Sequence, residues 1–287
     1  MQTAAELEDC TQIAEWIRTA CRWEVLAPKP GNVHPGAAFE DLTAGDFLES
    51  ADLIAPILAD APHSGVGAAI LSAVQATQAA LGRNTNLGII LLLAPLAAVP
   101  LERRLEDGVA EVLSRTNVAD AEFVYEAIRC AQPGGMGQVD EQDVAGTPTD
   151  TLVNVMRLAA PYDRIAAQYT DNYRDVLAFA VPQLQEWTDR VRDAAVAIVG
   201  LHLALMAHLP DTLIARKCGT ELAMESASRA QAVLDAGWPE SADGTAACAE
   251  FDRWLRADGH RRNPGTTADL IAATLFAAQR DSGWHAD

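Results

Sequence analysis

Apolar residues recur along most of this chain at helical spacing, and no period-2 alternation of useful length interrupts them. Apolar residues make up 49% of the chain, but only 6% of the chain is aromatic, so Ala, Leu, Ile and Val dominate. Abundant Ala, Leu, Glu and Arg with few β-branched runs favours helix over sheet. No repeat of about 20–50 residues is evident. The sequence therefore predicts an all-α protein.

The helical pattern predicts about ten to twelve helices, judged from typical helix length. Those that the pattern bounds span 3–26, 44–60, 66–82, 89–99, 101–116, 119–131, 150–159, 161–180, 188–209 and 266–280. Residues 132–150 are rich in Gly, Pro and Asp, and are either a linker or an active-site loop within one domain. We interpret residues 1–287 as one domain, a compact multi-helix bundle whose polar interhelical loops form a cleft.

The net charge of −19 disfavours nucleic acid and anionic membrane surfaces as partners, because both would be repelled. Five cysteines occur without a CxxC pair, and their odd number cannot form a closed disulfide set. The N-terminus lacks a signal peptide, and the longest apolar runs are short for a bilayer span. We therefore expect a cytoplasmic protein, with homo-oligomerisation left open.

Four polar breaks between the predicted helices, at 29–41, 83–88, 211–219 and 263–269, each combine glycine with Asn, Asp, Lys or Arg. Gly-rich turns at helix N-termini present backbone N–H groups to anions, and Arg and Lys neutralise phosphate. Carboxylates in the same place would hold Mg²⁺, a hard ion that takes oxygen ligands and bridges to phosphate. Together the breaks favour a phosphate-binding site with Mg²⁺.

Each acidic residue in or beside these breaks also has a purely structural interpretation. Asp46 has capping-box spacing, and Glu40 and Asp41 precede a helix whose dipole they would favour. Asp211 could simply start a helix, and Asp269 stands in a first helical turn. No P-loop, serine-elbow or HExxH pattern offers another assignment.

The order of the breaks resembles the triphosphoribosyl-dephospho-CoA synthase family, which serves citrate lyase and malonate decarboxylase. Its Pro-Lys-Pro-Gly-Leu-Val, Asn-Thr-His-Lys-Gly, Asp-(x)4-Arg-Gly-Gly and Pro-Gly-x-x-Ala-Asp-Leu-Leu motifs are matched in order. The corresponding segments are Pro28-Lys29-Pro30-Gly31-Asn32-Val33, Asn84-Thr85-Asn86-Leu87-Gly88, Asp211 to Gly219, and Pro264-Gly265-Thr266-Thr267-Ala268-Asp269-Leu270-Ile271.

The resemblance implies an all-helical transferase that takes ATP, expels adenine from C1′ of the ribose, and joins the triphosphoribosyl group to the 2′-hydroxyl of 3′-dephospho-CoA. Breaking the ribosyl–adenine bond builds oxocarbenium-like charge, which nearby carboxylates stabilise. A carboxylate can also serve as base on the attacking hydroxyl, and an acid must assist the departure of adenine.

Residue by residue, the resemblance implies catalytic roles for Asp41, Asp211 and Asp269. Mg²⁺ would be held by Glu40, Asp41 and Asp211. Nucleotide binding falls to Lys29, Gly31, Arg83, Asn84, Thr85, Arg216, Lys217 and Gly265. Which aspartate is the base and which is a metal ligand stays open at this stage.

The chain departs from the family pattern at three motif positions and in the segments 132–144 and 163–169. Phe39 stands where the family has histidine, Asn86-Leu87 replaces His-Lys, and Lys217-Cys218 displaces a glycine. These departures predict a divergent branch and leave the acceptor open, either 3′-dephospho-CoA or a related cofactor precursor with a hydroxyl. Two alternatives stand beside the transferase: a Mg²⁺-dependent hydrolase of nucleotides or N-glycosidic bonds, and a non-catalytic helical protein that binds a nucleotide.

Overall fold

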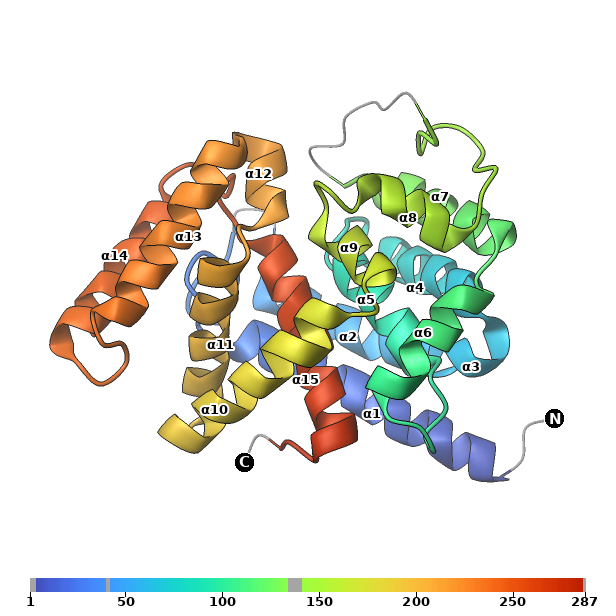
Figure 1. The fold of residues 1–287 in the computed structure, drawn as a ribbon, viewed down its shortest axis with the longest axis horizontal. Helices are drawn as coiled ribbons and strands as arrows, with labels where there is room; N and C mark the ends of the chain where they lie inside the picture. The colour runs from blue at the N-terminus through green and yellow to red at the C-terminus, as the bar shows by residue number, and fades with distance from the viewer. Residues whose placement is uncertain (1–3, 40–41, 134–140, 286–287) are drawn as a thin grey trace.

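The computed structural model describes residues 4–39, 42–133 and 141–285, and in this part of the chain helices are joined by loops (Figure 1). It contains fifteen α-helices, one π-helical segment and no strand, only an isolated bridge between His34 and Ala37. The all-α prediction is confirmed. The first helices are α1 (Ala4–Leu26), α2 (Ala44–Ala59), α3 (Ala61–Ser64), α4 (Val66–Leu81), α5 (Leu87–Ala97), α6 (Leu105–Arg115) and α7 (Val118–Ala131). The remainder are α8 (Leu152–Ala159), α9 (Arg164–Thr170), η1 (Asp175–Ala180), α10 (Val181–Val191), α11 (Ala194–His208), α12 (Thr212–Cys218), α13 (Thr220–Asp235), α14 (Ala242–Arg256) and α15 (Gly265–Ser282).

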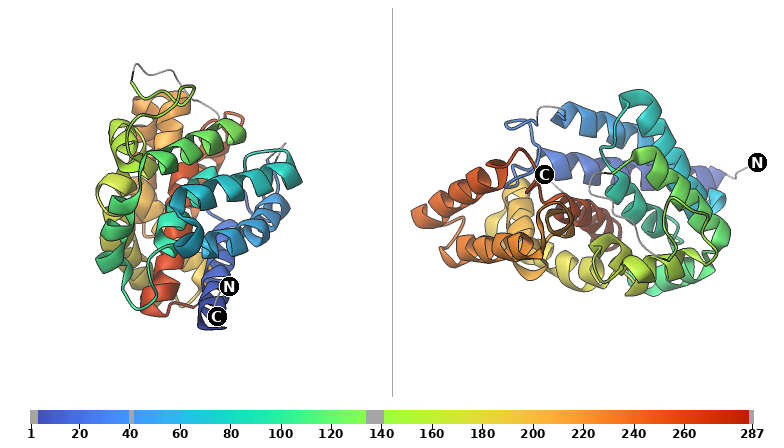
Figure 2. Two further views of the ribbon diagram at one scale, coloured as in Figure 1. Left: turned by 90° about the vertical axis from the view of Figure 1, so that its right-hand side faces the viewer. Right: turned by 90° about the horizontal axis from the view of Figure 1, so that it is seen from above.

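Helix α15 crosses the middle of the molecule, between the α10–α14 group and the helices from α1 to α9 (Figures 1 and 2). Every residue from Leu270 to Gln279 is buried, so this part of the helix is enclosed by protein on all sides. The larger hydrophobic core surrounds it, and a smaller core lies among α10 to α14, built around Trp187, Trp238 and Phe251. That residues 1–287 form one domain stays a prediction.

Helix α5 is the most apolar helix, and ten of its eleven residues are buried. Its Pro95 has no N–H, so the carbonyl of Leu91 loses its usual helical donor. The Tyr169 hydroxyl donates to that carbonyl at 2.6 Å, and the Tyr173 hydroxyl donates to Leu92 at 2.8 Å. These two bonds anchor the chain after α9 on α5.

The continuous helices predicted over 161–180 and 188–209 are wrong, because backbone turns divide both. Asn172 and Tyr173 adopt positive φ after α9, and Arg192 (φ 55°) separates α10 from α11. The Asp193 side chain then caps α11 by accepting from the Val196 N–H at 2.9 Å. Short helices such as α12 fall inside segments that the sequence suggested as breaks, which explains part of the larger helix count.

The segment after α1 folds back onto α14 and the start of α15. Gly31 has φ +78°, and its N–H donates to Asp252 at 2.8 Å. The Asn32 amide donates to Asn263 at 2.8 Å, while Arg256 donates to the Asn32 carbonyl at 2.6 Å. These bonds place a loop from the N-terminal end of the chain beside the C-terminal helices.

One smaller expectation is confirmed, because Thr43 and Asp46 form the predicted capping box at the start of α2. All five cysteines are free in the structure. In the described part of the chain no single helix is both long and apolar enough to cross a membrane. The pair α11 and α12, bent by 57°, passes by length and composition, and α11 is buried in the protein interior.

Candidate active site

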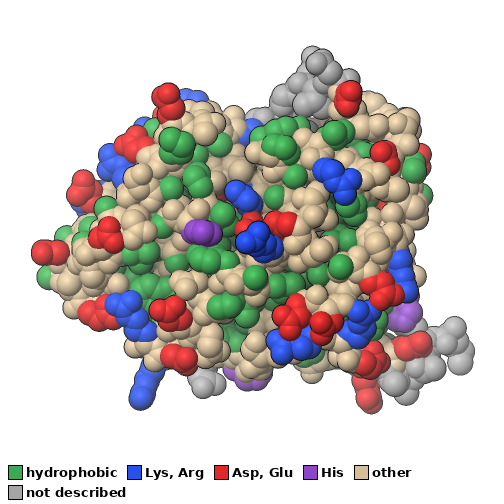
Figure 3. All heavy atoms as spheres, in the orientation of Figure 1, with side chains coloured by type: hydrophobic (Ala, Val, Ile, Leu, Met, Phe, Trp, Pro, Cys, Tyr) green, Lys and Arg blue, Asp and Glu red, His purple; other side chains and the backbone are tan. Residues whose placement is uncertain are grey.

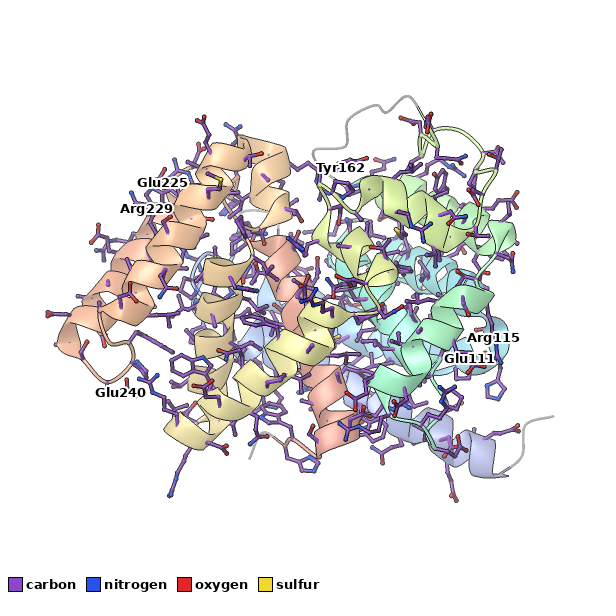
Figure 4. The ribbon with its side chains drawn as sticks, viewed as in Figure 1. Glu111, Arg115, Tyr162, Glu225, Arg229 and Glu240 are labelled. Atoms are coloured by element: carbon purple, nitrogen blue, oxygen red, sulfur yellow. The ribbon has the colours of Figure 1, made fainter. Side chains whose placement is uncertain are left out.

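A cleft of about 1150 Å³ lies where α1, α5, α9, α12 and α15 meet the loops that join them. Its walls come from segments distant in sequence, such as the end of α1 (Glu24 and Val25), the chain from Gly82 to Ile89, and the start of α15 (Gly265 and Asp269). Figure 3 shows acidic and basic side chains gathered near the middle of one face, within a largely hydrophobic surround. Tyr162, labelled in Figure 4, lines the cleft from the connection between α8 and α9.

The cleft lining combines apolar and polar side chains. The apolar ones come mainly from α5, α7, α8 and α9, and include Leu87, Leu91, Val124, Ile128, Val155, Met156 and Ile165. The polar ones come mainly from loops and helix ends, and include Glu24, Asn32, Arg83, Asn84, Thr85, Asp163, Arg216, Lys217 and Asp269. A cleft with such a lining suits a ligand that is partly apolar and partly anionic.

The break at 83–88 turns the chain into the start of α5 along the cleft. The Asn84 side chain accepts a hydrogen bond from the Leu87 N–H at 3.1 Å. The Thr85 hydroxyl is 2.5 Å from the hydroxyl of Ser50 on α2. Asn86 is buried, and its amide nitrogen has no partner among the described residues. The expected nucleotide-binding residues Arg83, Asn84 and Thr85 therefore do line the cleft.

Asp211 begins α12, but its carboxylate is fully engaged in the protein. One oxygen accepts from the N–H groups of Leu213 and Ile214, at 2.9 and 3.0 Å. The other oxygen accepts from the N–H and the hydroxyl of Thr267, both at 2.8 Å. Burial raises the pKa of Asp211, and these hydrogen bonds partly offset the rise. Asp211 is 2% exposed and does not line the cleft. Its role as the cap of α12 and its contact with Thr267 are therefore enough to explain an aspartate at this position.

Asp269 lies in the cleft on the first turns of α15, and it differs from Asp211 in having no hydrogen-bonding partner among the described residues. Its carboxylate packs on Gly88, where a Cβ would come within 2.0 Å of Oδ2. Burial raises its pKa well above the ordinary value, and Glu24, Asp211 and Asp163 raise it further. The guanidinium of Arg216 lowers it in part.

Arg216 and Lys217 bring positive charge to the same end of the cleft. Arg216 pairs with Asp163 at 2.9 Å, and Asp163 also caps α9 through the N–H of Ile165 at 2.8 Å. Lys217 lines the cleft without an ion pair among the described residues. Gly265 lines it as well, and a Cβ there would come within 2.6 Å of Leu213.

The structure does not place Lys29 at the cleft surface. Its side chain is 0% exposed and its ammonium is 3.0 Å from a carboxylate oxygen of Glu24, whose carbonyl oxygen also accepts from it. Gly31 does not line the cleft either, since a Cβ there would meet Leu255 and Pro264 at 2.8 and 2.9 Å. Close packing explains the glycine. Expected contacts of Lys29 and Gly31 with a nucleotide are therefore not supported by this geometry.

Glu40 and Asp41, the other expected metal ligands, lie outside the described residues. Asp211, the third expected ligand, has both oxygens occupied by hydrogen bonds. In the described ranges, three potential metal ligands converge within 4.8 Å only once, at residues that do not line the cleft: Cys10, Asp60 and His63. The described residues of the cleft therefore do not by themselves form a Mg²⁺ site.

Comparison with known proteins supplies the family. A family described as ATP:dephospho-CoA triphosphoribosyl transferase, CitG, matches residues 10–287. The chain belongs to this family. It is therefore a transferase related to the synthases of a coenzyme A derivative, as its sequence motifs suggested.

Named relatives of this CitG-family chain agree with that assignment. A Pseudomonas syringae pv. syringae protein named "Probable 2-(5''-triphosphoribosyl)-3'-dephosphocoenzyme-A synthase" is 28% identical over 88% of this chain and 84% of its own. The synthase of Klebsiella pneumoniae is 35% identical over 35% of each chain. A crystal structure from Archaeoglobus fulgidus, provisionally assigned as a triphosphoribosyl-dephospho-CoA synthase, has TM-score 0.64 and 25% identity. It covers 83% of this chain and 100% of its own.

The sequence interpretation singled out neither Glu24 nor Asp163, which are two of the acidic residues that line the cleft. Glu24 stands near the end of an ordinary amphipathic helix, and only its spacing to Lys29 connects the two. Asp163 lies after a Pro-Tyr turn, where it looks like a plain helix cap. Phe39, at the position of the family histidine, stacks on His260 with ring centroids 3.8 Å apart, so the loop keeps an aromatic contact there.

Proposed function

We propose that this enzyme transfers the triphosphoribosyl group of ATP to the 2′-hydroxyl of 3′-dephospho-CoA and releases adenine. Membership of the family supports the reaction type. The observation that carries the proposal is Asp269, a carboxylate without a hydrogen-bonding partner among the described residues, inside a cleft large enough for a nucleotide. The hydrogen bonds that hold the cleft loops, such as the one accepted by Asn84, do not involve Asp269 and do not explain why a carboxylate is enclosed there.

The apolar and the cationic residues of the cleft lining match the two parts of the donor. Apolar residues such as Leu91 and Ile128 suit the adenine ring. Arg83, Arg216 and Lys217 are the cationic residues that line the cleft among those described, and they would hold the triphosphate. The triphosphate stays attached to the transferred ribose, so these residues need to bind it without activating it for cleavage.

Asp269 is suited to assist the departure of adenine. Because burial and neighbouring carboxylates raise its pKa well above the ordinary value, the protonated form is favoured. A protonated carboxyl can donate to a ring nitrogen of adenine while the C1′–N9 bond breaks. Adenine then leaves as a neutral base rather than as an anion.

Mg²⁺ would enter bound to the triphosphate, as hard cations commonly do at phosphate sites. Glu40 and Asp41 stay its candidate ligands from this chain. We also propose that no nucleic acid or membrane takes part, since a net charge of −19 repels both.

Incubation with ATP, Mg²⁺ and 3′-dephospho-CoA, followed by mass analysis, tests the proposal. We expect one equivalent of adenine for each triphosphoribosyl adduct. Adenine release that is independent of the acceptor would instead indicate a hydrolase. The absence of any adduct, across a panel that includes other hydroxyl-bearing cofactor precursors, would overturn the transferase proposal for these acceptors.

A further inference from the structure

The ion pair between Glu24 and Lys29 is placed unusually for a pair that serves only stability. Lys29 is 0% exposed and Glu24 is 5% exposed, yet Glu24 belongs to the lining of the cleft. Taking both charges out of water costs several kcal/mol for each ion, and apolar replacements are often equally stable. Packing alone therefore does not explain why this end of α1 carries the pair.

Lys29 directs its ammonium only at Glu24 among the described residues. It is 3.0 Å from one carboxylate oxygen and donates to the Glu24 carbonyl, which lies in the last turns of α1. Carbonyl groups at a helix C-terminus favour a cation, so the ammonium is well placed there. The result is a carboxylate whose charge is balanced and whose position is fixed.

The titratable groups around the pair supply no competing counter-charge. His202 on α11 is buried, and its pKa falls to about 3 through burial and the nearby Lys29 charge, so it is neutral. Cys21 on α1 has its pKa raised by burial and by the charges of Glu24 and Asp269. His34 in the following loop has its pKa lowered, mainly by burial and by the charge of Arg256, with a smaller effect of Lys29.

Glu24 and Asp269 are thus two carboxylates of one cleft with opposite surroundings. Glu24 has an ammonium partner, whereas Asp269 has none and lies within the electrostatic influence of Glu24. In enzymes that use acid and base together, two such groups in unlike environments divide the two tasks. Asp163 is not equivalent, because a helix cap and Arg216 occupy its oxygens.

We infer that Glu24 is the base that accepts the proton of the acceptor hydroxyl, and that Lys29 is a positioning residue that holds the Glu24 carboxylate in place. This inference rests on the proposed function. In the balanced step, the C1′–N9 bond breaks and a C1′–O bond to the acceptor forms. The hydroxyl proton passes to Glu24, and the proton of Asp269 passes to adenine. Afterwards Glu24 returns its proton to Asp269 or to water, and no other reactant is needed.

Three variants test this assignment: Glu24→Gln, Lys29→Met and the double variant. The single Glu24→Gln change leaves a buried ammonium without a partner and can impair folding, whereas the double variant removes both charges together. We expect the double variant to fold, to bind ATP within a few-fold of wild type, and to lose about 10²–10⁴-fold in kcat. A double variant that folds and keeps kcat within about threefold would overturn the assignment.

Lys29→Met gives a readout that a structural role would not produce. Without the ammonium the Glu24 carboxylate loses the contact that fixes its position, so kcat should fall while KM for ATP stays within a few-fold of wild type. In the Glu24→Gln background, Lys29→Met should add little further loss of kcat. Full additivity of the two losses would show that Lys29 does not act through Glu24, and would overturn its positioning role.

The wild-type enzyme is assayed in parallel with ATP and 3′-dephospho-CoA, which separates the two proposals. If wild type forms no adduct, the proposed function fails, whatever the variants do. If wild type forms the adduct and the folded double variant does so at a similar rate, the assignment of Glu24 fails alone.

Discussion

The start of α12 and the cleft face of α15 lie in contact, and each carries an enclosed aspartate, but the two groups are used differently. Asp211 accepts four hydrogen bonds, two from its own helix and two from Thr267 on α15. Asp269, two residues farther along α15, has no such bond among the described residues and lies against Gly88 in the cleft. The first fixes how two helices meet, and the second remains available to a substrate.

The difference shows that burial by itself does not mark a catalytic carboxylate. Both pKa values rise through loss of solvent, but the donors around Asp211 counteract the rise. At Asp269 the neighbouring negative charges add to it. The number of hydrogen-bond donors around the carboxylate distinguishes the structural role of Asp211 from the chemical role proposed for Asp269. Both roles can be tested by substitution.

Asp269→Asn should give the largest effect. It keeps the shape of the side chain but removes the transferable proton, so we expect kcat for adenine release to fall about 10²–10⁴-fold. Stability should not fall, because no described hydrogen bond is lost. Steady-state kinetics and thermal unfolding of the same preparation check this, and a variant with near-normal kcat would contradict an acid role for Asp269.

Gly88→Ala should give the next largest loss of kcat. The added Cβ would meet Asp269 at 2.0 Å and displace its carboxylate, and a shift of about 1 Å can cost about 10²-fold in rate. Gly45→Ala is a matched control on α2, where the nearest atom would be 3.4 Å away. In an Asp269→Asn background, Gly88→Ala should add little further loss of kcat, and full additivity would contradict the mechanism.

Asp211→Asn should act mainly on stability. An amide would present N–H groups to the donors of Thr267 or of α12, so we expect about 1–3 kcal/mol less free energy of unfolding. Thr267→Val removes only the hydroxyl donor and should cost less. Denaturant unfolding measures both variants. Loss of kcat as severe as in Asp269→Asn, without loss of stability, would show that the comparison is wrong.

The smallest effect concerns the pH dependence of unfolding. Because the pKa of Asp269 is raised by folding, the native state binds its proton more tightly than the unfolded chain does. Wild-type stability should therefore decrease as pH rises from about 4, the ordinary aspartate pKa, through the raised value. Asp269→Asn should lack this contribution, whereas the exposed control Asp189→Asn should retain it. Parallel slopes for wild type and Asp269→Asn would contradict the raised pKa.

Local patterns were sufficient for the fold class and for part of the cleft. The capping box of Thr43 and Asp46 depends on residues three apart, so it could be predicted from the sequence. Asn84, Thr85 and Arg216 were candidates because polar breaks between helices commonly carry function, and they line the cleft. The division of the segment 161–180 was missed, because it depends on tyrosine contacts with α5 across the core.

The sequence by itself determined an all-helical chain with four polar breaks and a recognisable order of motifs, since helix propensity, caps and spacing act over a few residues. Only the tertiary structure decided what the charged groups of those breaks do. Lys29 turns inward to Glu24, Asp211 is enclosed by donors, and Asp269 faces the cleft. The physical reason is that solvation, counter-charge and hydrogen-bond donors all come from neighbours distant in sequence.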